Sequence, residues 1–290
     1  MNASNMQHSV DLATEVGESF ALPPAGISLD FLRSNAVDGR MLHPRHSMDR
    51  DDSALLGMVS TGYVACGAHA GDALVMGRTV RMLLERGLTI GAHPSYPDIV
   101  GFGQKPLDLP DREFEDMVLM QVAGLSAIAR SAGGAVTVVK CHGALAFDVS
   151  YDERTAQVMS RTLYKLDPNI ALVCMSGSPG VRVALDCGVR VIEEAYIDRG
   201  YDASGRIVSR QHPKALITSV AEAAEQFRRI LEERVVISVD GDAVPLRADS
   251  FCLHSDTPNA GAIAQAIAGQ VQASRAHVQA ARGRVNRQSV

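Results

Sequence analysis

Four short apolar segments of this chain each end in a histidine, and this pattern constrains the fold more than any other feature. The histidines are His69, His93, His142 and His254. Each apolar run is too short for a helix and is followed by Gly, Pro, Ser or Asp residues, which end regular structure. Each therefore predicts a buried β-strand with a histidine at its carboxyl end.

Helical segments separate these predicted strands, which favours a parallel sheet. The core strands begin near residues 10, 63, 89, 136, 170, 189 and 250, and amphipathic segments with capping residues lie between nearly all of them. With 290 residues and no dinucleotide-binding fingerprint, the pattern predicts an α/β fold with a single (β/α)7 barrel. A doubly wound open sheet is the alternative.

The carboxyl ends of parallel strands share one face of such a fold, and active sites are built there. A lone histidine at a strand end is usually a hydrogen-bonded structural residue, but four in one chain favour a shared site. We therefore expect the four histidines on a common rim. Further charged residues lie at the same strand ends or follow another strand: Asp72, Asp98, Lys140, Asp198, Arg199 and Asp256.

Three segments are expected outside the barrel domain, which spans residues 9–274. Residues 1–8 predict a disordered N-terminal tail. Residues 21–50 contain prolines and glycines with only fragments of a helical pattern, and they predict an insertion that acts as a lid or an oligomer contact. Residues 275–290 are basic, contain no acidic residue, and predict a solvated, poorly ordered tail.

The composition excludes several classes of function. A net charge of -5 leaves no basic surface typical of nucleic-acid binding, and no apolar run approaches the roughly 20 residues that span a bilayer. The first residues lack the basic and apolar blocks of a signal peptide, so a cytoplasmic location is expected. The five cysteines form no C-x-x-C pair and predict buried thiols, with Cys141 kept as a candidate reactive thiol.

The chemistry of the predicted rim is that of a hydrolase. The chain has neither the P-loop motif nor the G-x-S-x-G motif. Imidazoles and carboxylates beside a lysine suit either acid/base attack of water on a carbonyl or a divalent metal that activates the water. Asp11 lies inside an apolar strand and could meet His69, Asp72 and His142 as metal ligands, while Lys140 could stabilise an oxyanion.

Several longer motifs carry a resemblance to a known family. They are Cys66 to Asp72 (CGAHAGD), Gly91 to Asp98 (GAHPSYPD) with Gly101-Phe102-Gly103, Lys140 to Leu145 (KCHGAL), and Asp198-Arg199 with Tyr201. From Asp11 to about Ala273 the chain resembles the LamB/YcsF lactam-utilisation family, which includes the A subunit of prokaryotic 5-oxoprolinase.

This resemblance implies a barrel similar to the polysaccharide-deacetylase and glycoside-hydrolase type. It also implies a part in the ATP-dependent opening of 5-oxoproline to glutamate, with ATP acting through a complex with two sister subunits. His93 or His142 would then be the base, Lys140 and Arg199 cationic stabilisers, and Asp11 a further catalytic group. A divalent metal at Asp11, His69 and His142 and a homo-oligomer remain open. The substrate-binding candidates are His69, Asp72, Ser95, Tyr96, Asp98, Phe102, Asp198, His254 and Asp256.

The chain departs from the family pattern at several positions. The family's opening motif is Asp-Leu-Asn-x-Asp-Leu-Gly-Glu, but Ala13 and Glu15 replace its Asn and its second Asp. Three hypotheses follow: an active 5-oxoprolinase subunit, a divergent stand-alone metal-dependent amidase or deacetylase, and a catalytically silent paralogue. The other departures are Cys141 for Pro, Ala146-Phe147 for Tyr-Asn, and Ser255 for Gly.

Overall fold

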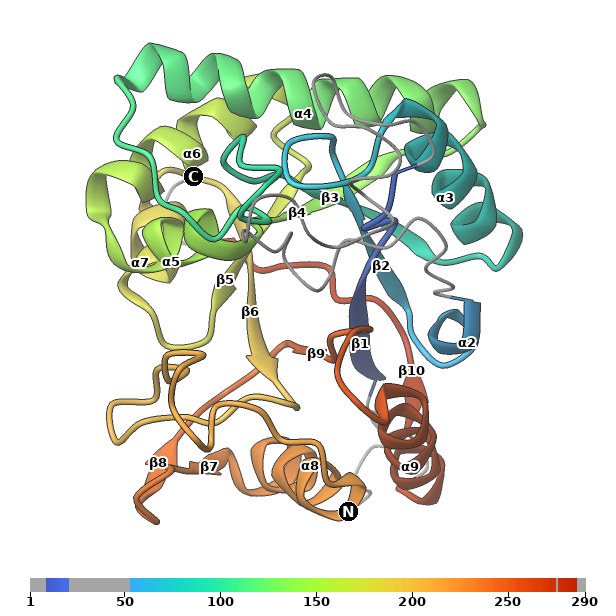
Figure 1. Ribbon diagram of the computed structural model, residues 1–290, viewed down its shortest axis with the longest axis vertical. Helices are drawn as coiled ribbons and strands as arrows, with labels where there is room; N and C mark the ends of the chain where they lie inside the picture. The colour runs from blue at the N-terminus through green and yellow to red at the C-terminus, as the bar shows by residue number, and fades with distance from the viewer. Residues whose placement is uncertain (1–8, 21–52, 275, 286–290) are drawn as a thin grey trace, which may run out of the picture.

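A closed barrel of seven parallel strands forms the centre of the molecule (Figure 1). The computed structural model describes residues 9–20, 53–274 and 276–285. β9 closes the barrel because it pairs with both β6 and β1. The predicted (β/α)7 barrel is therefore confirmed, and the open sheet is excluded. The barrel strands, in order, are β1 (Ser9–Val16), β2 (Thr61–Ala65), β3 (Thr89–His93), β4 (Val136–Lys140), β5 (Ala171–Met175), β6 (Arg190–Tyr196) and β9 (Ser250–Cys252).

Helices cover the outside of the barrel, and Figure 1 shows α8 and α9 on the opposite side from α4 and α6. A short antiparallel hairpin of β7 (Val235–Ile237) and β8 (Ala243–Pro245) follows α8. Among the described residues, no helix is long and apolar enough to cross a membrane. The helices are α2 (Ser53–Leu56), α3 (Ala73–Glu85), α4 (Asp111–Ser131), α5 (Gly143–Tyr151), α6 (Glu153–Leu166), α7 (Pro179–Asp186), α8 (Val220–Arg228) with the π-helical turn η1 (Arg229–Glu233), and α9 (Ala260–Ala273).

Residues 143–166 form two consecutive helices, α5 and α6. The Ser150 hydroxyl, near the end of α5, accepts a hydrogen bond from the Met175 N–H of β5. The cap of α6 is Asp152, whose carboxylate accepts from the Thr155 N–H at 2.8 Å. The extended backbone of Asp152 ends α5 at Tyr151 and starts α6 at Glu153, so the two helices are separate.

Alternate residues of each strand point into the barrel and form layers, because the side-chain period of a strand is two. The middle layer is mainly apolar, and it includes Ala13, Tyr63, Val138 and Ile192. Two residues further along the strands, the next inward layer is polar. It contains Glu15, His93, Lys140, Glu194 and Cys252.

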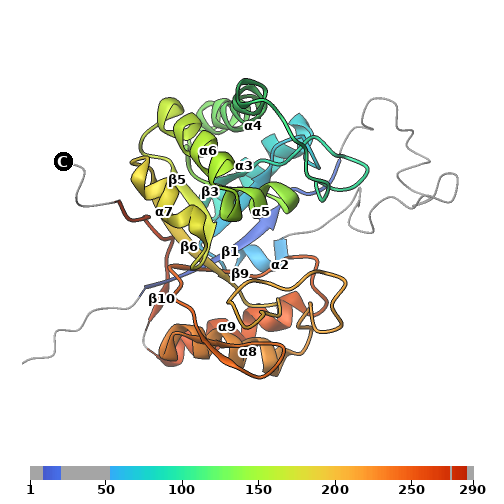
Figure 2. The same ribbon diagram turned by 90° about the vertical axis from the view of Figure 1, so that its left-hand side faces the viewer.

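The C-terminal segment closes the other end of the barrel. β10 (His277–Val278) pairs with the start of β1, beside which it lies in Figure 2. Arg284 exchanges two backbone hydrogen bonds with Val191 of β6, each 2.9 Å long. Ala281 packs against the apolar middle layer. The prediction of a solvated tail is therefore wrong for residues 276–285, because backbone pairing and apolar contact hold this segment. The predicted tail of residues 1–8 and the insertion at 21–50 lie outside the described residues.

Gly91 lies where the barrel interior is too tightly packed for a larger side chain. A Cβ at this position would lie 2.5 Å from Cδ1 of Tyr63 and 3.0 Å from Cγ1 of Val138. Gly91→Ala should lower the free energy of unfolding by about 1–3 kcal/mol, measured by urea denaturation. Gly124→Ala is the control, since Gly124 lies exposed within α4 with open space around it, and alanine there should raise stability by about 0.5–1 kcal/mol. Equal effects of the two changes would contradict the packing described.

Candidate active site

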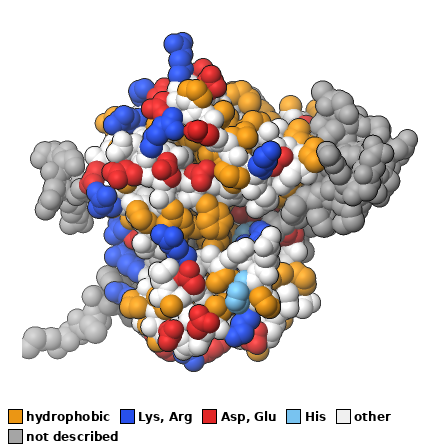
Figure 3. All heavy atoms as spheres, turned by 60° about the vertical axis from the view of Figure 1, so that its left-hand side comes forward, with side chains coloured by type: hydrophobic (Ala, Val, Ile, Leu, Met, Phe, Trp, Pro, Cys, Tyr) orange, Lys and Arg blue, Asp and Glu red, His pale blue; other side chains and the backbone are white. Residues whose placement is uncertain are grey.

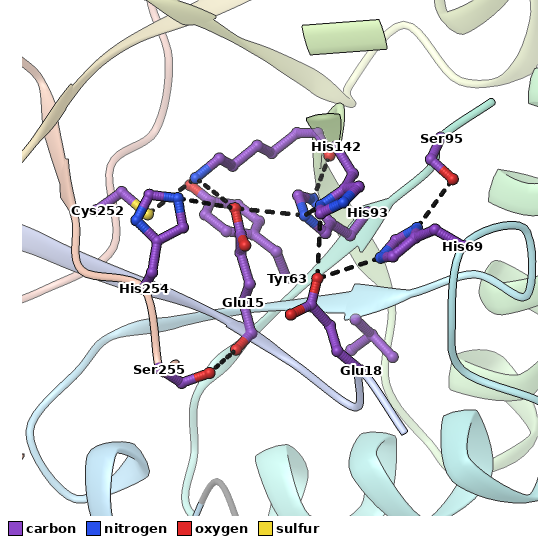
Figure 4. Close-up of polar contacts among 12 residues, drawn as sticks. Glu15, Glu18, Tyr63, His69, His93, Ser95, His142, Cys252, His254 and Ser255 are labelled. Carbon is purple, nitrogen blue, oxygen red and sulfur yellow. Dashed lines mark hydrogen bonds and ion pairs between the residues drawn. The ribbon is translucent and has the colours of Figure 1, made fainter. Parts of the chain in front are cut away.

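The polar layer and the loops that follow it form one buried site at the carboxyl ends of the strands (Figure 4). All four predicted histidines lie there, together with Lys140, Asp198 and Arg199. The structure therefore brings together the centre of the predicted rim. Two groups can be distinguished, one around Lys140 and Glu15 and one around Glu18, and Glu15 contacts both.

Lys140 carries an ammonium group into the barrel. Its Nζ lies 2.7 Å from Oε2 of Glu194 and 3.3 Å from Oε1 of Glu15, and it also contacts Sγ of Cys252 at 2.9 Å. Burial alone would lower the pKa of Lys140. Electrostatic attraction to its neighbours outweighs burial and holds this pKa well above its usual value; the neighbours are Cys252, Glu194, Tyr196 and Glu15. Burial raises the pKa of the Cys252 thiol, so near neutral pH the counter-charges are carboxylates.

Glu15 lies between Lys140 and two imidazoles. Its Oε1 is 3.4 Å from Nε2 of His93 and 3.8 Å from Nε2 of His254. Burial alone would raise the pKa of Glu15, but attraction to His254, His93 and Lys140 outweighs burial and holds this pKa well below its usual value. Glu15 is therefore ionised at neutral pH and connects the two groups.

Three imidazoles surround the Glu18 carboxylate. Its Oε1 is 3.2 Å from Nε2 of His69 and 3.4 Å from Nδ1 of His142, and Nε2 of His93 is 3.0 Å from the same Nδ1 of His142. Burial lowers the pKa of His69 and lowers that of His142 well below its usual value. Burial would raise the pKa of Glu18, but its close contact with His69 outweighs this and lowers it. The lowered pKa values leave His69 and His142 neutral at neutral pH beside an ionised carboxylate.

The Phe102-Gly103 turn holds this group in place. The Phe102 carbonyl lies 2.9 Å from Nε2 of His142, and the Phe102 ring packs edge-on against His69 and His142. Gly103 has a φ of 66°, and a Cβ there would lie 2.9 Å from the His142 ring. Glycine is needed because the loop must turn with a positive φ while it touches the imidazole.

Asp198 and His254 form a second buried pair. Nδ1 of His254 lies 2.9 Å from Oδ1 of Asp198, whose carboxylate also accepts hydrogen bonds from the His254 N–H and the Thr257 hydroxyl. Burial would raise the pKa of Asp198, but His254 outweighs it and lowers this pKa. Next to His254, the Ser255 hydroxyl donates a hydrogen bond to the main-chain carbonyl of Glu15 at 3.0 Å. Ser255, which replaces a glycine of the family motif, therefore supports the main chain of β1.

A cleft of about 980 Å³ opens over the site. Glu15, Lys140, His142, Arg199 and His254 line its floor and side, whereas His69 and His93 lie beneath it. Figure 3 shows hydrophobic side chains gathered in a band across the middle of one face of the molecule. The walls of the cleft come from α5 and from residues 202–211, and they include Ala144, Ala146, Phe147, Tyr151, Ile207 and Val208.

The structure does not bring Asp11 to this site. Asp11 faces the barrel interior, as Glu15 does, but four residues of strand separate them by roughly 13 Å. Its Oδ1 accepts hydrogen bonds from the hydroxyls of Ser60 and Thr61. The prediction that Asp11 is catalytic or a metal ligand beside His69 and His142 is therefore wrong, because it lies at the opposite end of the barrel.

Other predicted site residues hold the loops instead. Asp72 caps α3 and accepts from the N–H groups of Leu74 and Val75, which removes it from the expected metal group. Asp98 accepts from the Gly101 N–H, and the Tyr96 hydroxyl donates to Asp148 of α5. Ser95 supports His69, and Asp256 is partly exposed beyond His254. Cys141 is buried, and burial raises the pKa of its thiol well above its usual value, which favours the protonated form at neutral pH.

Sequence reasoning missed several members of the site. Glu18 and Glu15 belonged to a recognised motif but were not predicted as site residues, and Glu194, Tyr63 and Cys252 were not predicted at all. The signal was the strand period, since Glu194 is two residues after the inward Ile192 on β6. Among the residues that the structure describes, two sets of donor atoms lie close enough to hold a metal ion, each set within 4.8 Å. They are Glu18, His69, His93 and His142, and Glu15, Cys252 and His254.

The Lys140 ion pairs should dominate the stability of the site. Lys140→Met leaves Glu15 and Glu194 buried without their cation and should lower the free energy of unfolding by about 3–5 kcal/mol, measured by urea denaturation. Adding Glu194→Gln in the same chain should restore part of this loss, because one buried charge is removed. A loss below about 1 kcal/mol for Lys140→Met would mean that the network contributes little.

Comparison with known proteins agrees with the resemblance seen in the sequence. The model of the LamB/YcsF family matches residues 42–286. The chain is 40% identical over 222 residues to the 5-oxoprolinase A subunit of Paracidovorax citrulli, covering 77% of this chain and 88% of the relative. It is 42% identical over 230 residues to the 5-oxoprolinase A subunit of Chloroflexus aurantiacus, covering 79% and 91%. The crystal structure of the lactam utilization protein from Thermus thermophilus matches with a TM-score of 0.80 at 31% identity, covering 94% of this chain and 100% of that one. Motifs, barrel and relatives agree, and the chain belongs to the LamB/YcsF family.

Proposed function

We propose that this chain is the A subunit of an ATP-dependent 5-oxoprolinase, which opens the lactam of 5-oxoproline to glutamate together with two sister subunits. The observation that carries the proposal is the Asp198–His254 pair, which lies beside Glu15 and Lys140 at the floor of the cleft. Family membership supports the same substrate class, because relatives are named as the A subunit of 5-oxoprolinase.

His254 is the general base in this proposal. Its Nδ1–H donates to the buried Asp198, so Nε2 carries the lone pair and can take a proton from water. His93 and His142 were expected in this role. Each of them bonds a carbonyl oxygen through one ring nitrogen, and the remaining nitrogens, Nε2 of His93 and Nδ1 of His142, face each other beside Glu18. The base is therefore assigned to His254 instead.

Two cations complete the proposed site. Arg199 lines the cleft, and its Nε and Nη2 donate to the carbonyls of Ala215 and Val208, which fixes its guanidinium. A fixed guanidinium suits the carboxylate of 5-oxoproline or a phosphate. Lys140 is the cation available for the oxyanion that forms when water adds to the lactam carbonyl.

The proposed reaction forms a carbon–oxygen bond and breaks the lactam carbon–nitrogen bond. His254 takes a proton from the attacking water and then donates it to the leaving nitrogen, so it acts first as the general base and then as the general acid. A five-membered lactam is a stable amide, and coupling to ATP drives its opening. ATP is assigned to the complex, because the chain has no P-loop motif.

One observation favours the alternative of a stand-alone metal-dependent amidase or deacetylase. Glu18, His69, His93 and His142 offer donor atoms that lie close together, as a metal hydrolase requires. The two functions differ in what they need. The 5-oxoprolinase function requires ATP and sister subunits, whereas the alternative requires neither.

The first test is to combine the purified chain with the sister subunits, ATP and 5-oxoproline, and to measure glutamate. Release should require every component. His254→Asn should reduce kcat by a factor of about 100 or more, since loss of a general base costs about this much. Met120→Gln, on an exposed position of α4 away from the cleft, is the matched control and should retain activity. Full activity of folded His254→Asn would exclude the assigned base, and glutamate release without ATP or partners would exclude the 5-oxoprolinase proposal.

A further inference from the structure

Main-chain oxygens define which ring nitrogen of the imidazoles around Glu18 carries the proton. Nδ1 of His93 lies 2.7 Å from the Lys140 carbonyl, and Nε2 of His142 lies 2.9 Å from the Phe102 carbonyl. A carbonyl oxygen only accepts hydrogen bonds, so each of these nitrogens carries the ring proton. In the neutral form of each ring, Nε2 of His93 and Nδ1 of His142 then carry the lone pairs.

His69 is held in the same way through Ser95. Its Nδ1 lies 2.8 Å from the Ser95 hydroxyl, and that hydroxyl donates its single proton to the Tyr96 carbonyl at 2.9 Å. The hydroxyl must then accept from Nδ1, which leaves the lone pair on Nε2 of His69. The side-chain amide of Gln104 is 3.3 Å from Nε2 of His142, a longer contact than the one to Phe102.

These lone pairs all point into one small space, where Figure 4 shows the three rings around the Glu18 carboxylate. Nε2 of His93 and Nδ1 of His142 are only 3.0 Å apart, yet neither has a proton for the other. Glu18 brings a negative oxygen within 3.4 Å of two of the rings. Acceptors that face one another repel, so the arrangement needs a positive charge at its centre.

The distances fit a metal ion at that centre. Zinc binds histidine nitrogen and carboxylate oxygen at about 2.0–2.2 Å, so neighbouring ligand atoms of a tetrahedral site lie about 3.4 Å apart. The contacts of 3.0, 3.2 and 3.4 Å are close to this value, and all four donor atoms lie within 4.8 Å of one another. Metal-binding histidines also typically donate their second N–H to an oxygen, as all three rings do here.

We propose that Glu18, His69, His93 and His142 bind one divalent transition-metal ion of the zinc class. Three imidazoles and one carboxylate suit zinc, cobalt, nickel or ferrous iron better than magnesium or calcium, which prefer oxygen ligands. The site differs from the predicted group of Asp11, His69 and His142, because Glu18 replaces Asp11 and His93 joins it. The proposal goes beyond the 5-oxoprolinase function, in which no step uses these four residues.

Metal binding is tested on the full chain without substrate or partners. The purified chain is stripped with a chelator, titrated with Zn²⁺ or Co²⁺, and analysed for bound metal by mass spectrometry. We expect about one ion per folded chain and the intense visible absorption of tetrahedral Co²⁺. Zn²⁺ should also raise the melting temperature, because it binds the folded state.

Variants separate this site from its neighbour. Glu18→Gln should abolish stoichiometric binding, and Ser95→Ala, which removes only the support of His69, should weaken affinity by about 10- to 100-fold. His254→Ala removes an imidazole from the adjacent group and should keep the full metal content. Circular dichroism confirms that each variant folds.

Three outcomes would overturn the assignment. Folded wild-type chain that takes up none of the zinc-class ions would show that a proton, not a metal, holds the cluster together. Unchanged affinity in folded Glu18→Gln would remove the carboxylate from the site. Loss of metal in His254→Ala would move the ion to the group of Glu15, Cys252 and His254. Because none of these measurements uses 5-oxoproline, failure of the metal site and failure of the proposed function are distinguishable.

Discussion

The charge of Lys140 inside the barrel is the constraint on which the rest of the site depends. Its side chain is only 3% exposed, and removing an ammonium group from water costs several kcal/mol. Glu194 and Glu15 offset this cost by direct contact, and the Tyr63 hydroxyl donates to the far oxygen of Glu194. These residues come from β4, β6, β1 and β2, so the network forms only when the barrel closes in the correct register.

Glu15 extends this network into the two groups that carry the chemistry. It lies close to Lys140, His93 and His254, so the charge state of each group influences the others. The site holds the ionised carboxylates of Glu15, Glu18 and Asp198 around few cations. A buried excess of negative charge is costly, so these carboxylates favour a cation beside Glu18 and a developing positive charge on His254.

Much of the barrel could be predicted from local patterns. Strand and helix periodicity, together with capping residues between the strands, predicted the order of the elements and the barrel. The four histidines and Lys140 were predicted at the correct end because parallel strands end on one face. The error at Asp11 arose because hydrophobic pattern shows that a residue is buried, but not at which end of the barrel it lies. The error at residues 276–285 arose because a polar segment can be held by backbone pairing, which composition does not report.

The sequence by itself determined the seven parallel strands, the side on which the site lies, and the family motifs that suggest lactam chemistry. These features depend on local periodicity and on residues that end strands, so they can be read along the chain. Only the tertiary structure decided which atoms meet. Glu15 rather than Asp11 reaches Lys140, Asp198 orients His254, and the carbonyls of Lys140 and Phe102 fix the protons of His93 and His142. These contacts join residues that are far apart in the chain, and strand register and loop geometry set their distances.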